Sequence, residues 1–136
     1  MIANIVPTGE LLLAELDIDP SNLTVPSGQL DDYIAVINWL TDYEPNPDAP
    51  NLEKVRGCLE AFHHLCQVEA WVKASNLLFT RLNTIEKEEL HNQLNTWGYY
   101  HEQYDLYTKL LELLEGGLKT LFIKDTTNIF YNEQAE

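Results

Sequence analysis

The chain is short of basic side chains, and this shortage excludes several classes of partner. Only 8 of its 136 residues are Lys or Arg, against 22 Asp or Glu, which gives a formal net charge of −14. Proteins that bind nucleic acid use Lys and Arg to displace the counterions of the phosphates, and anionic membranes attract the same residues. We therefore expect neither nucleic acid nor a membrane surface as a partner.

Cysteines and long apolar runs are also scarce. The two cysteines, Cys58 and Cys66, stand eight residues apart. On one helix their Cα atoms would be separated by about 12 Å, which is too far for a disulfide. No apolar run approaches the ~20 residues that cross a bilayer, and no Lys or Arg precedes Lys54 to form the basic start of a secretory signal peptide. These features predict a reduced, cytoplasmic protein.

The acidic side chains are unevenly distributed along the chain. Residues 1–51 contain nine acids and no Lys or Arg, whereas the rest of the chain contains 13 acids and 8 bases. An excess of one charge keeps a protein soluble, and it also steers partners of opposite charge toward it. Three interpretations stay open: a solubility effect, a protein partner with a basic surface, or an acidic inhibitor that mimics DNA.

Apolar residues recur at helical spacing on both sides of Gly98, and this pattern predicts a helical hairpin. Leu90, Leu94 and Trp97 occupy the i, i+4 and i+7 positions of one helix face. The same spacing continues after the glycine at Tyr100, Tyr104, Tyr107, Leu111 and Leu114. Glycine accepts the positive φ that a chain needs when it leaves a helix at its carboxyl end. We expect the two apolar faces to be buried and the chain to turn at Gly98.

Helical patterns elsewhere in the chain place it in the all-α class. Helices are expected over residues 10–16 with Thr8 as the cap, and over 27–40, 51–66, 68–82, 85–97 and 100–114. Three prolines between Thr41 and Asn51 exclude a helix there and mark an internal linker. We therefore expect about five to six helices arranged as antiparallel hairpins.

The domain organisation follows from the linker and from a pair of glycines. Gly116 and Gly117 are expected to end the last helix, which leaves a less regular tail. The length fits one domain. Its parts are an acidic N-terminal region with the linker (1–50), a body of helical hairpins (51–118) and the tail (119–136).

The residues around Gly98 resemble the centre of a tetratricopeptide repeat, in which a Gly-x-Tyr turn precedes an aromatic residue at fixed spacing. The matching residues are Leu94, Gly98, Tyr100, Tyr107 and Leu110, and an upstream copy about 29 residues earlier contains Leu65, Trp71, Ala74 and Leu78. The pattern departs from the repeat at Glu69, which replaces the turn glycine of the upstream copy, and at Gln103 and Leu110, which replace small residues. The resemblance covers roughly residues 51–115 and implies an α-solenoid of antiparallel helical hairpins.

Longer phrases are similar to a segment of large cyanobacterial tetratricopeptide-repeat proteins. The phrases are LEKVRGCLEAFHHLCQVEAW, LLFTRLNT and EELHNQLNTWGYYHEQYDLYTKLL. In that family the segment precedes ordinary repeats, and some members carry nucleotide-binding or protease-like modules. The resemblance implies a helical-repeat adaptor in a cyanobacterial cytoplasm, without an enzymatic module.

The predicted function is a non-catalytic adaptor that binds another protein, without cofactor or enzymatic activity. Tyr and Trp dominate the hot spots of protein interfaces, so the clustered aromatic residues are the candidate contacts. The predicted partner-binding residues are Trp71, Tyr99, Tyr100 and Tyr104. A repeat array exposes its terminal apolar face unless a segment caps it. We expect either a cap or a homodimer through this end, formed by Phe122, Ile123, Phe130 and Tyr131.

A metal-binding helical bundle is the alternative function. The motif Glu-x-x-His occurs at Glu60–His63 and at Glu88–His91, and di-iron bundles use this pair twice with two further glutamates. Such ligands must project into the centre of the bundle, whereas the predicted inner faces place both motifs at the edges of their helices. The sequence therefore favours the adaptor over the metal centre.

Overall fold

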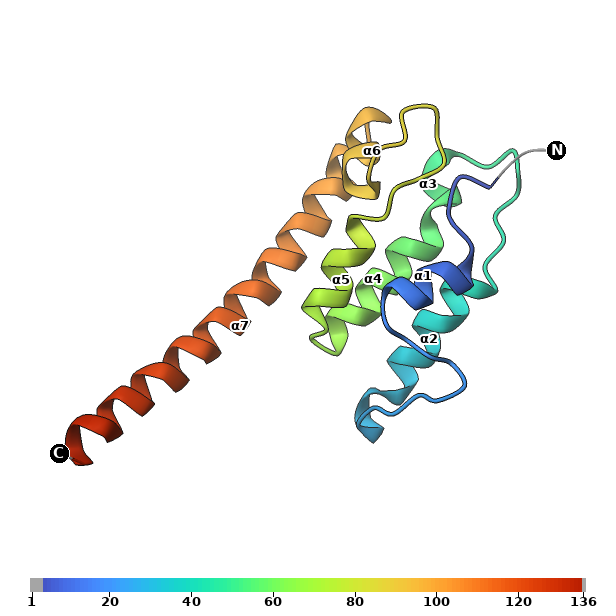
Figure 1. Cartoon of the computed structure of the whole chain (residues 1–136). Coiled ribbons are helices and arrows are strands. Elements are labelled where there is room, and N and C mark those ends of the chain that lie inside the picture. The colour runs from blue at the N-terminus through green and yellow to red at the C-terminus, as the bar shows by residue number, and fades with distance from the viewer. Residues whose placement is uncertain (1–3, 136) are drawn as a thin grey trace.

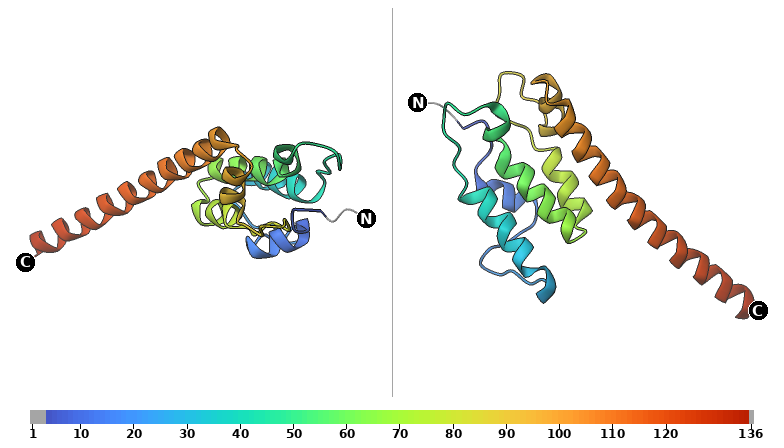
Figure 2. Two further views of the ribbon diagram at one scale, coloured as in Figure 1. Left: turned by 90° about the horizontal axis from the view of Figure 1, so that it is seen from above. Right: turned by 180° about the vertical axis from the view of Figure 1, so that it is seen from behind.

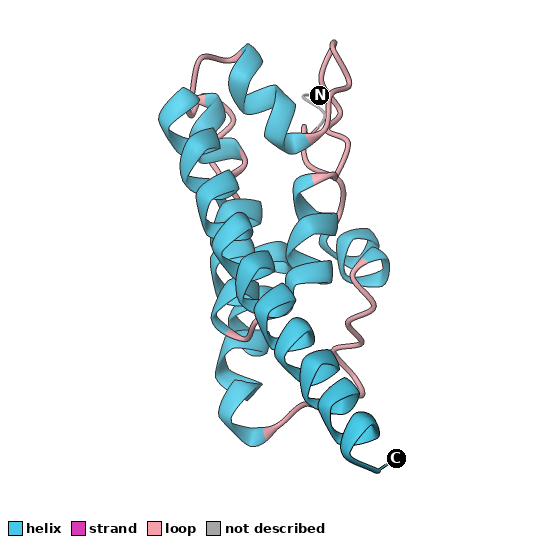
Figure 3. Ribbon diagram, turned by 90° about the vertical axis from the view of Figure 1, so that its left-hand side faces the viewer, coloured by secondary structure: helices cyan, strands magenta, loops and turns pink. Residues whose placement is uncertain are grey.

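Every regular element in the described part of the chain is a helix, which confirms the all-α prediction (Figures 1 and 3). The computed structural model describes the backbone of residues 4–135 and the side chains of residues 4–117. The elements are α1 (Gly9–Glu15), the 3₁₀ helix η1 (Ser27–Gln29), α2 (Leu30–Thr41), α3 (Asn51–Lys54), α4 (Arg56–Gln67), α5 (Trp71–Leu78), α6 (Leu90–Thr96) and α7 (Tyr100–Ala135). Residues 4–135 contain no strand; Arg81 and Glu89 form an isolated antiparallel bridge.

α1 begins where the sequence predicts, because Thr8 caps its first turn. The Oγ1 atom of Thr8 accepts a hydrogen bond from the Leu11 amide at 3.3 Å. Glu10 in the first turn places a negative charge at the positive end of the helix dipole. Caps of this kind stabilise a helix by about 1 kcal/mol. They hold α1 in place while Leu12 and Leu13 enter the core.

Helices on the two sides of the proline-rich linker pack closely against each other. α2 lies along α4 (Figure 1), and a Cβ atom on Gly57 would lie 2.6 Å from the carbonyl oxygen of Trp39. Only glycine permits this approach without a shift of the backbone. Val36 of α2 and Phe62 of α4 are fully buried in the same cluster. The acidic N-terminal region and the helical body therefore share one hydrophobic core.

Three helices end with the same left-handed turn. Asp17, Glu69 and Gly98 follow α1, α4 and α6 with φ values of 57°, 58° and 88°. In each turn the next amide donates to a carbonyl near the helix end, from Ile18 to Leu13 (2.9 Å), from Ala70 to Leu65 (2.9 Å) and from Tyr99 to Leu94 (2.8 Å). This pattern is the Schellman motif. The positive φ predicted at Gly98 is confirmed, and Glu69 occupies the equivalent position in the preceding hairpin.

The predicted helices over residues 68–82 and 85–97 are shorter in the structure. α5 and α6 leave residues 79–89 as a loop. The Leu90 amide donates to the Thr80 carbonyl at 2.8 Å across the base of this loop. Because this bond satisfies backbone groups that a helix would otherwise pair, the loop ends are stable without helical structure.

α7 is the longest element, and it runs away from the other helices (Figure 2). It contains 36 residues and is therefore about 54 Å long. The predictions that Gly116 and Gly117 end this helix, and that residues 119–136 form a less regular tail, are wrong for the backbone up to Ala135. Each glycine weakens a helix by only about 1 kcal/mol relative to alanine, which neighbouring helix-forming residues offset.

The predicted cap over the last hairpin falls on residues 119–136. The backbone of α7 continues away from the hairpins instead of folding back over them (Figures 1 and 2). The side chains named for the cap, Phe122, Ile123, Phe130 and Tyr131, lie outside the described residues. Among residues 4–135, no helix combines the length and the apolarity that crossing a bilayer requires.

Candidate protein-binding surface

α7 carries two apolar faces, and the structure buries only one of them. Leu106 is 2% exposed, and Leu110 and Leu113 pack partly buried against the core. The face that the sequence predicts to be buried is open to solvent instead. Its exposed fractions are 64% at Tyr100, 68% at Tyr104, 42% at Tyr107 and 58% at Leu111. These four residues form what we call the outer face of α7.

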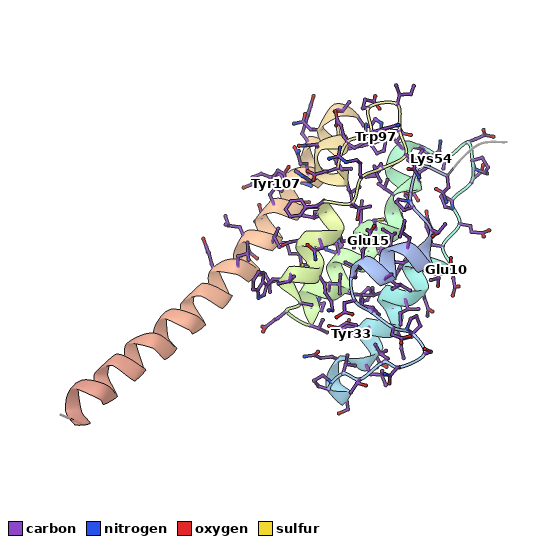
Figure 4. All side chains as sticks on the ribbon, viewed as in Figure 1. Glu10, Glu15, Tyr33, Lys54, Trp97 and Tyr107 are labelled. Carbon is purple, nitrogen blue, oxygen red and sulfur yellow. The ribbon has the colours of Figure 1, made fainter. Side chains whose placement is uncertain are left out.

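Tyr107 lies on α7 where this helix passes α6 (Figure 4). A chain of hydrogen bonds holds its side chain in place. The Nε2 amide of Gln103 donates to the Tyr107 hydroxyl at 3.0 Å, and this hydroxyl lies 2.8 Å from Nδ1 of His91. Nε2 of His91 lies 2.9 Å from a carboxylate oxygen of Glu89. A neutral imidazole with its proton on Nε2 satisfies all three contacts, because Tyr107 then donates to Nδ1. The network fixes the Tyr107 ring before any partner arrives.

Phe79 extends the apolar surface from α7 onto the end of α5. Its ring centroid lies 5.6 Å from that of His91, and His91 lies 5.8 Å from Tyr107, both in edge-to-face geometry. Such ring pairs contribute about 0.5–1.5 kcal/mol beyond their buried area. Phe79 itself is 53% exposed. The outer face of α7 together with Phe79 is called the aromatic surface below.

The structure brings two of the four predicted partner-binding residues onto this surface. Tyr100 and Tyr104 belong to it, whereas Tyr99 and Trp71 lie elsewhere. The hydroxyl of Tyr99 accepts a hydrogen bond from the Leu52 amide at 3.4 Å, and its partly buried ring packs on the core. Tyr99 thus joins the α6–α7 turn to α3. Trp71 is 46% exposed, but it begins α5 and is about 12 Å along the helix axis from Phe79.

The two Glu-x-x-His motifs have other partners in the structure. Glu60 pairs with Arg56 at 3.5 Å, and Nδ1 of His63 lies 3.4 Å from the ammonium of Lys109. Glu88 accepts a hydrogen bond from Thr96 at 2.6 Å, and both ring nitrogens of His91 are bonded as described above. Within the described residues, no three His, Cys, Asp or Glu side chains gather into a set that could hold a metal.

The two cysteines are buried as thiols. Cys58 is 1% exposed, and burial raises the pKa of its thiol to about 12. Burial also raises the pKa of Cys66, against a smaller opposing effect of the positive charge on Lys109. A nucleophilic cysteine needs the thiolate form near neutral pH. Both side chains therefore act as small apolar residues of the core.

Acidic side chains outnumber basic ones in the described part of α7. Residues 100–117 contain Glu102, Asp105, Glu112 and Glu115 but only one basic side chain, Lys109. His101, which is largely exposed, pairs with Asp105 at 3.3 Å. This stretch of α7 therefore carries an excess of negative charge.

Sequence reasoning missed Phe79 and the role of His91. Phe79 lies inside the helix predicted over residues 68–82, directly after Leu77 and Leu78, and no periodicity distinguishes it from a core residue. The Glu-x-x-His motif pairs His91 with Glu88 in sequence, whereas the partners of His91 in the structure are Glu89 and Tyr107. The spacing of His91 and Tyr107 gives no signal, because the contact depends on how α6 and α7 cross.

Comparison with family models, with curated proteins and with solved structures found no match to this chain.

Proposed function

We propose that this protein is a non-catalytic adaptor that binds another protein through the aromatic surface. The observation that carries the proposal is the exposure of Tyr100, Tyr104, Tyr107 and Leu111 on one continuous face of α7. Contiguous exposed apolar patches on otherwise soluble domains mark interaction sites. Tyrosine is also among the residues that contribute most to binding energy.

Preorganisation adds to this argument. Ordering a side chain on binding costs about 0.5–1.5 kcal/mol, and a residue already held in its bound position avoids this cost. Tyr107 is held by Gln103 and His91 in the unbound chain. Tyr100 and Tyr104, which are more exposed, provide contact area on the two helix turns that precede Tyr107.

The helical-repeat interpretation belongs to the same proposal. The α4–α5 and α6–α7 hairpins have equivalent left-handed turns at Glu69 and Gly98. The two turns are 29 residues apart, which is shorter than the 34 residues of a tetratricopeptide repeat. Helical repeats bind partners along extended faces of stacked hairpins. A face built by the last hairpin and the end of α5 is consistent with that mode of binding.

Paired substitutions test the proposal. The double variant Tyr100→Ala, Tyr104→Ala should lose proteins that the wild-type chain captures from its host lysate, with its melting temperature nearly unchanged. The matched control is Leu11→Ala, which truncates a side chain that is 50% exposed on α1 and should retain those proteins. A double variant that retains every captured protein, or that unfolds, would contradict the proposal.

A further inference from the structure

A cavity of about 380 Å³ lies between the segment that follows α1 and the helices α2 and α5. The segment contributes residues 17–19 and 22–25, α2 contributes Tyr33, and α5 contributes Lys73. This volume is at the lower end of the range for small-molecule pockets. Figure 4 shows Tyr33 and Tyr107 at separate places in the body, and the cavity shares no described residue with the aromatic surface. It is therefore a second candidate site, independent of the first.

Tyr33 brings a polar group without a partner to this cavity. The residue is only 7% exposed, and its hydroxyl forms no hydrogen bond with the described residues, although buried tyrosine hydroxyls usually have a partner. The hydroxyl is not fully enclosed, because Gln93 Nε2 is the only enclosed side-chain atom without a bond in the described part of the chain. Burial raises the pKa of Tyr33, so the hydroxyl keeps its proton at neutral pH and can donate to a ligand.

Lys73 gives the same space a positive charge that is also unpaired. It lines both this cavity and a smaller hollow beside it, and Tyr33 lines both as well. The Lys73 side chain is half-buried, and it forms no ion pair or hydrogen bond with any residue that the structure describes. An ammonium and a phenolic hydroxyl are both donors, and one carboxylate can accept from both. These two side chains therefore suit the carboxylate of a ligand.

The segment after α1 brings two carboxylates to the same cavity, Asp17 and Asp19. Oδ1 of Asp19 accepts hydrogen bonds from the amide (3.0 Å) and the hydroxyl (2.7 Å) of Ser21. These bonds lower the pKa of Asp19, which keeps the carboxylate ionised, and they leave Oδ2 available. The two aspartates repel a ligand that is only an anion, and Lys73 repels one that is only a cation. A ligand that carries both charges satisfies all of these groups.

We propose that this cavity binds a small apolar α-amino acid as its zwitterion. Lys73 and Tyr33 bind the carboxylate of the ligand, and the two carboxylates of the segment after α1 bind its ammonium. Leu23 and Val25 also line the cavity and are partly buried against the core, so they provide an apolar wall for an aliphatic side chain. The inference goes beyond the proposed function, because it adds a small-molecule ligand at a site separate from the aromatic surface.

Isothermal titration calorimetry of the full chain with L-leucine tests the class of ligand. L-Leucine should bind. The matched compounds are 4-methylpentanoate, which lacks the ammonium, and 3-methylbutylamine, which lacks the carboxylate. Each should bind about tenfold more weakly or worse, because it leaves a charged group of the cavity without its partner. Absence of L-leucine binding at millimolar concentration, or equal affinity for either single-charge compound, would overturn the inference.

Single substitutions test the residues of the site. Tyr33→Phe removes only the hydroxyl and Lys73→Met removes only the charged end, and each should raise the Kd for L-leucine about tenfold. Asp17→Asn removes one carboxylate at a φ of 57°, which asparagine accepts, and should also weaken binding. The matched control is Lys54→Met, which removes a half-buried cation that lines other hollows and should leave the Kd unchanged. Folded Tyr33→Phe and Lys73→Met chains that bind L-leucine like the wild type would overturn the inference.

Discussion

The α4–α5 and α6–α7 hairpins both turn through a left-handed residue, Glu69 in the first and Gly98 in the second, and then differ in their second helix. α5 has 8 residues, whereas α7 has 36 and carries an apolar face that the core leaves open. The comparison shows that local turn chemistry creates each hairpin. It also shows that contacts distant in sequence decide which side of the second helix is buried.

The largest loss of stability is expected at the buried leucines that occupy equivalent positions in the two hairpins. Leu65 and Leu94 accept the equivalent bond of each turn and are fully buried. Because truncation of a buried leucine leaves a cavity, Leu65→Ala and Leu94→Ala should each lower the free energy of unfolding by about 2–5 kcal/mol in urea denaturation. Val72→Ala, at an exposed residue of α5, should change it by less than about 0.5 kcal/mol. Unequal losses at the two leucines would show that the turns are not equivalent.

Substitution of Gly98, the turn residue of the second hairpin, should lower the stability by a smaller amount. A Cβ at Gly98 meets no atom within 4 Å, so Gly98→Ala tests the positive φ alone. A left-handed conformation costs a residue with a Cβ about 1–2 kcal/mol, and the melting temperature of Gly98→Ala should fall accordingly. Gly28→Ala, also in open space but without a positive φ, is the control. Equal melting temperatures for Gly98→Ala and the wild type would refute the assignment of strain.

The first hairpin offers the opposite substitution. Glu69 is exposed and has a φ of 58°, so Glu69→Gly should remove strain and raise the free energy of unfolding by up to about 1 kcal/mol. Glu69→Ala keeps the Cβ and should give no gain, which separates the backbone effect from loss of the carboxylate. A Glu69→Gly chain that is less stable than the wild type would contradict this prediction. It would mean that the Glu69 side chain stabilises the fold by more than the positive φ destabilises it.

The contact between the hairpins should respond to pH. His63 of α4 lies beside Lys109 of α7, and burial, with the lysine charge, lowers the pKa of His63 from its usual 6.5. The unfolded chain therefore binds a proton more readily than the folded chain below about pH 6.5. This contribution to stability is complete above that pH and declines as the pH falls toward the lowered pKa. Chemical denaturation of His63→Gln at neutral and mildly acidic pH should show a weaker decline than the wild type, and an equal decline would exclude His63 as its source.

Much of the fold could be predicted because its determinants are local. Thr8 as a cap, the non-helical linker between Thr41 and Asn51 and the positive φ at Gly98 all depend on residues within one turn of chain. The all-α class follows from the same kind of signal. These features require no knowledge of which helices meet.

The exposed side of α7 could not be predicted, because both sides have helical spacing. Tyr104 and Leu111 match the pattern of a buried face as well as Leu106 and Leu113 do. The core buries the leucines, and this choice depends on how α4, α5 and α6 pack against α7. The helix after Gly117 was missed for a related reason, since glycine is a frequent terminator but only a modest cost within a long helix.

The free energies of unfolding of Leu106→Ala and Tyr104→Ala, measured at a concentration where the chain is monomeric, test the central claim most directly. Leu106 is 2% exposed and Tyr104 is 68% exposed. We expect Leu106→Ala to lose about 2–5 kcal/mol and Tyr104→Ala to stay within about 0.5 kcal/mol of the wild type. A large loss at Tyr104 with little loss at Leu106 would mean that the core covers the aromatic face, and that this face is not a binding surface.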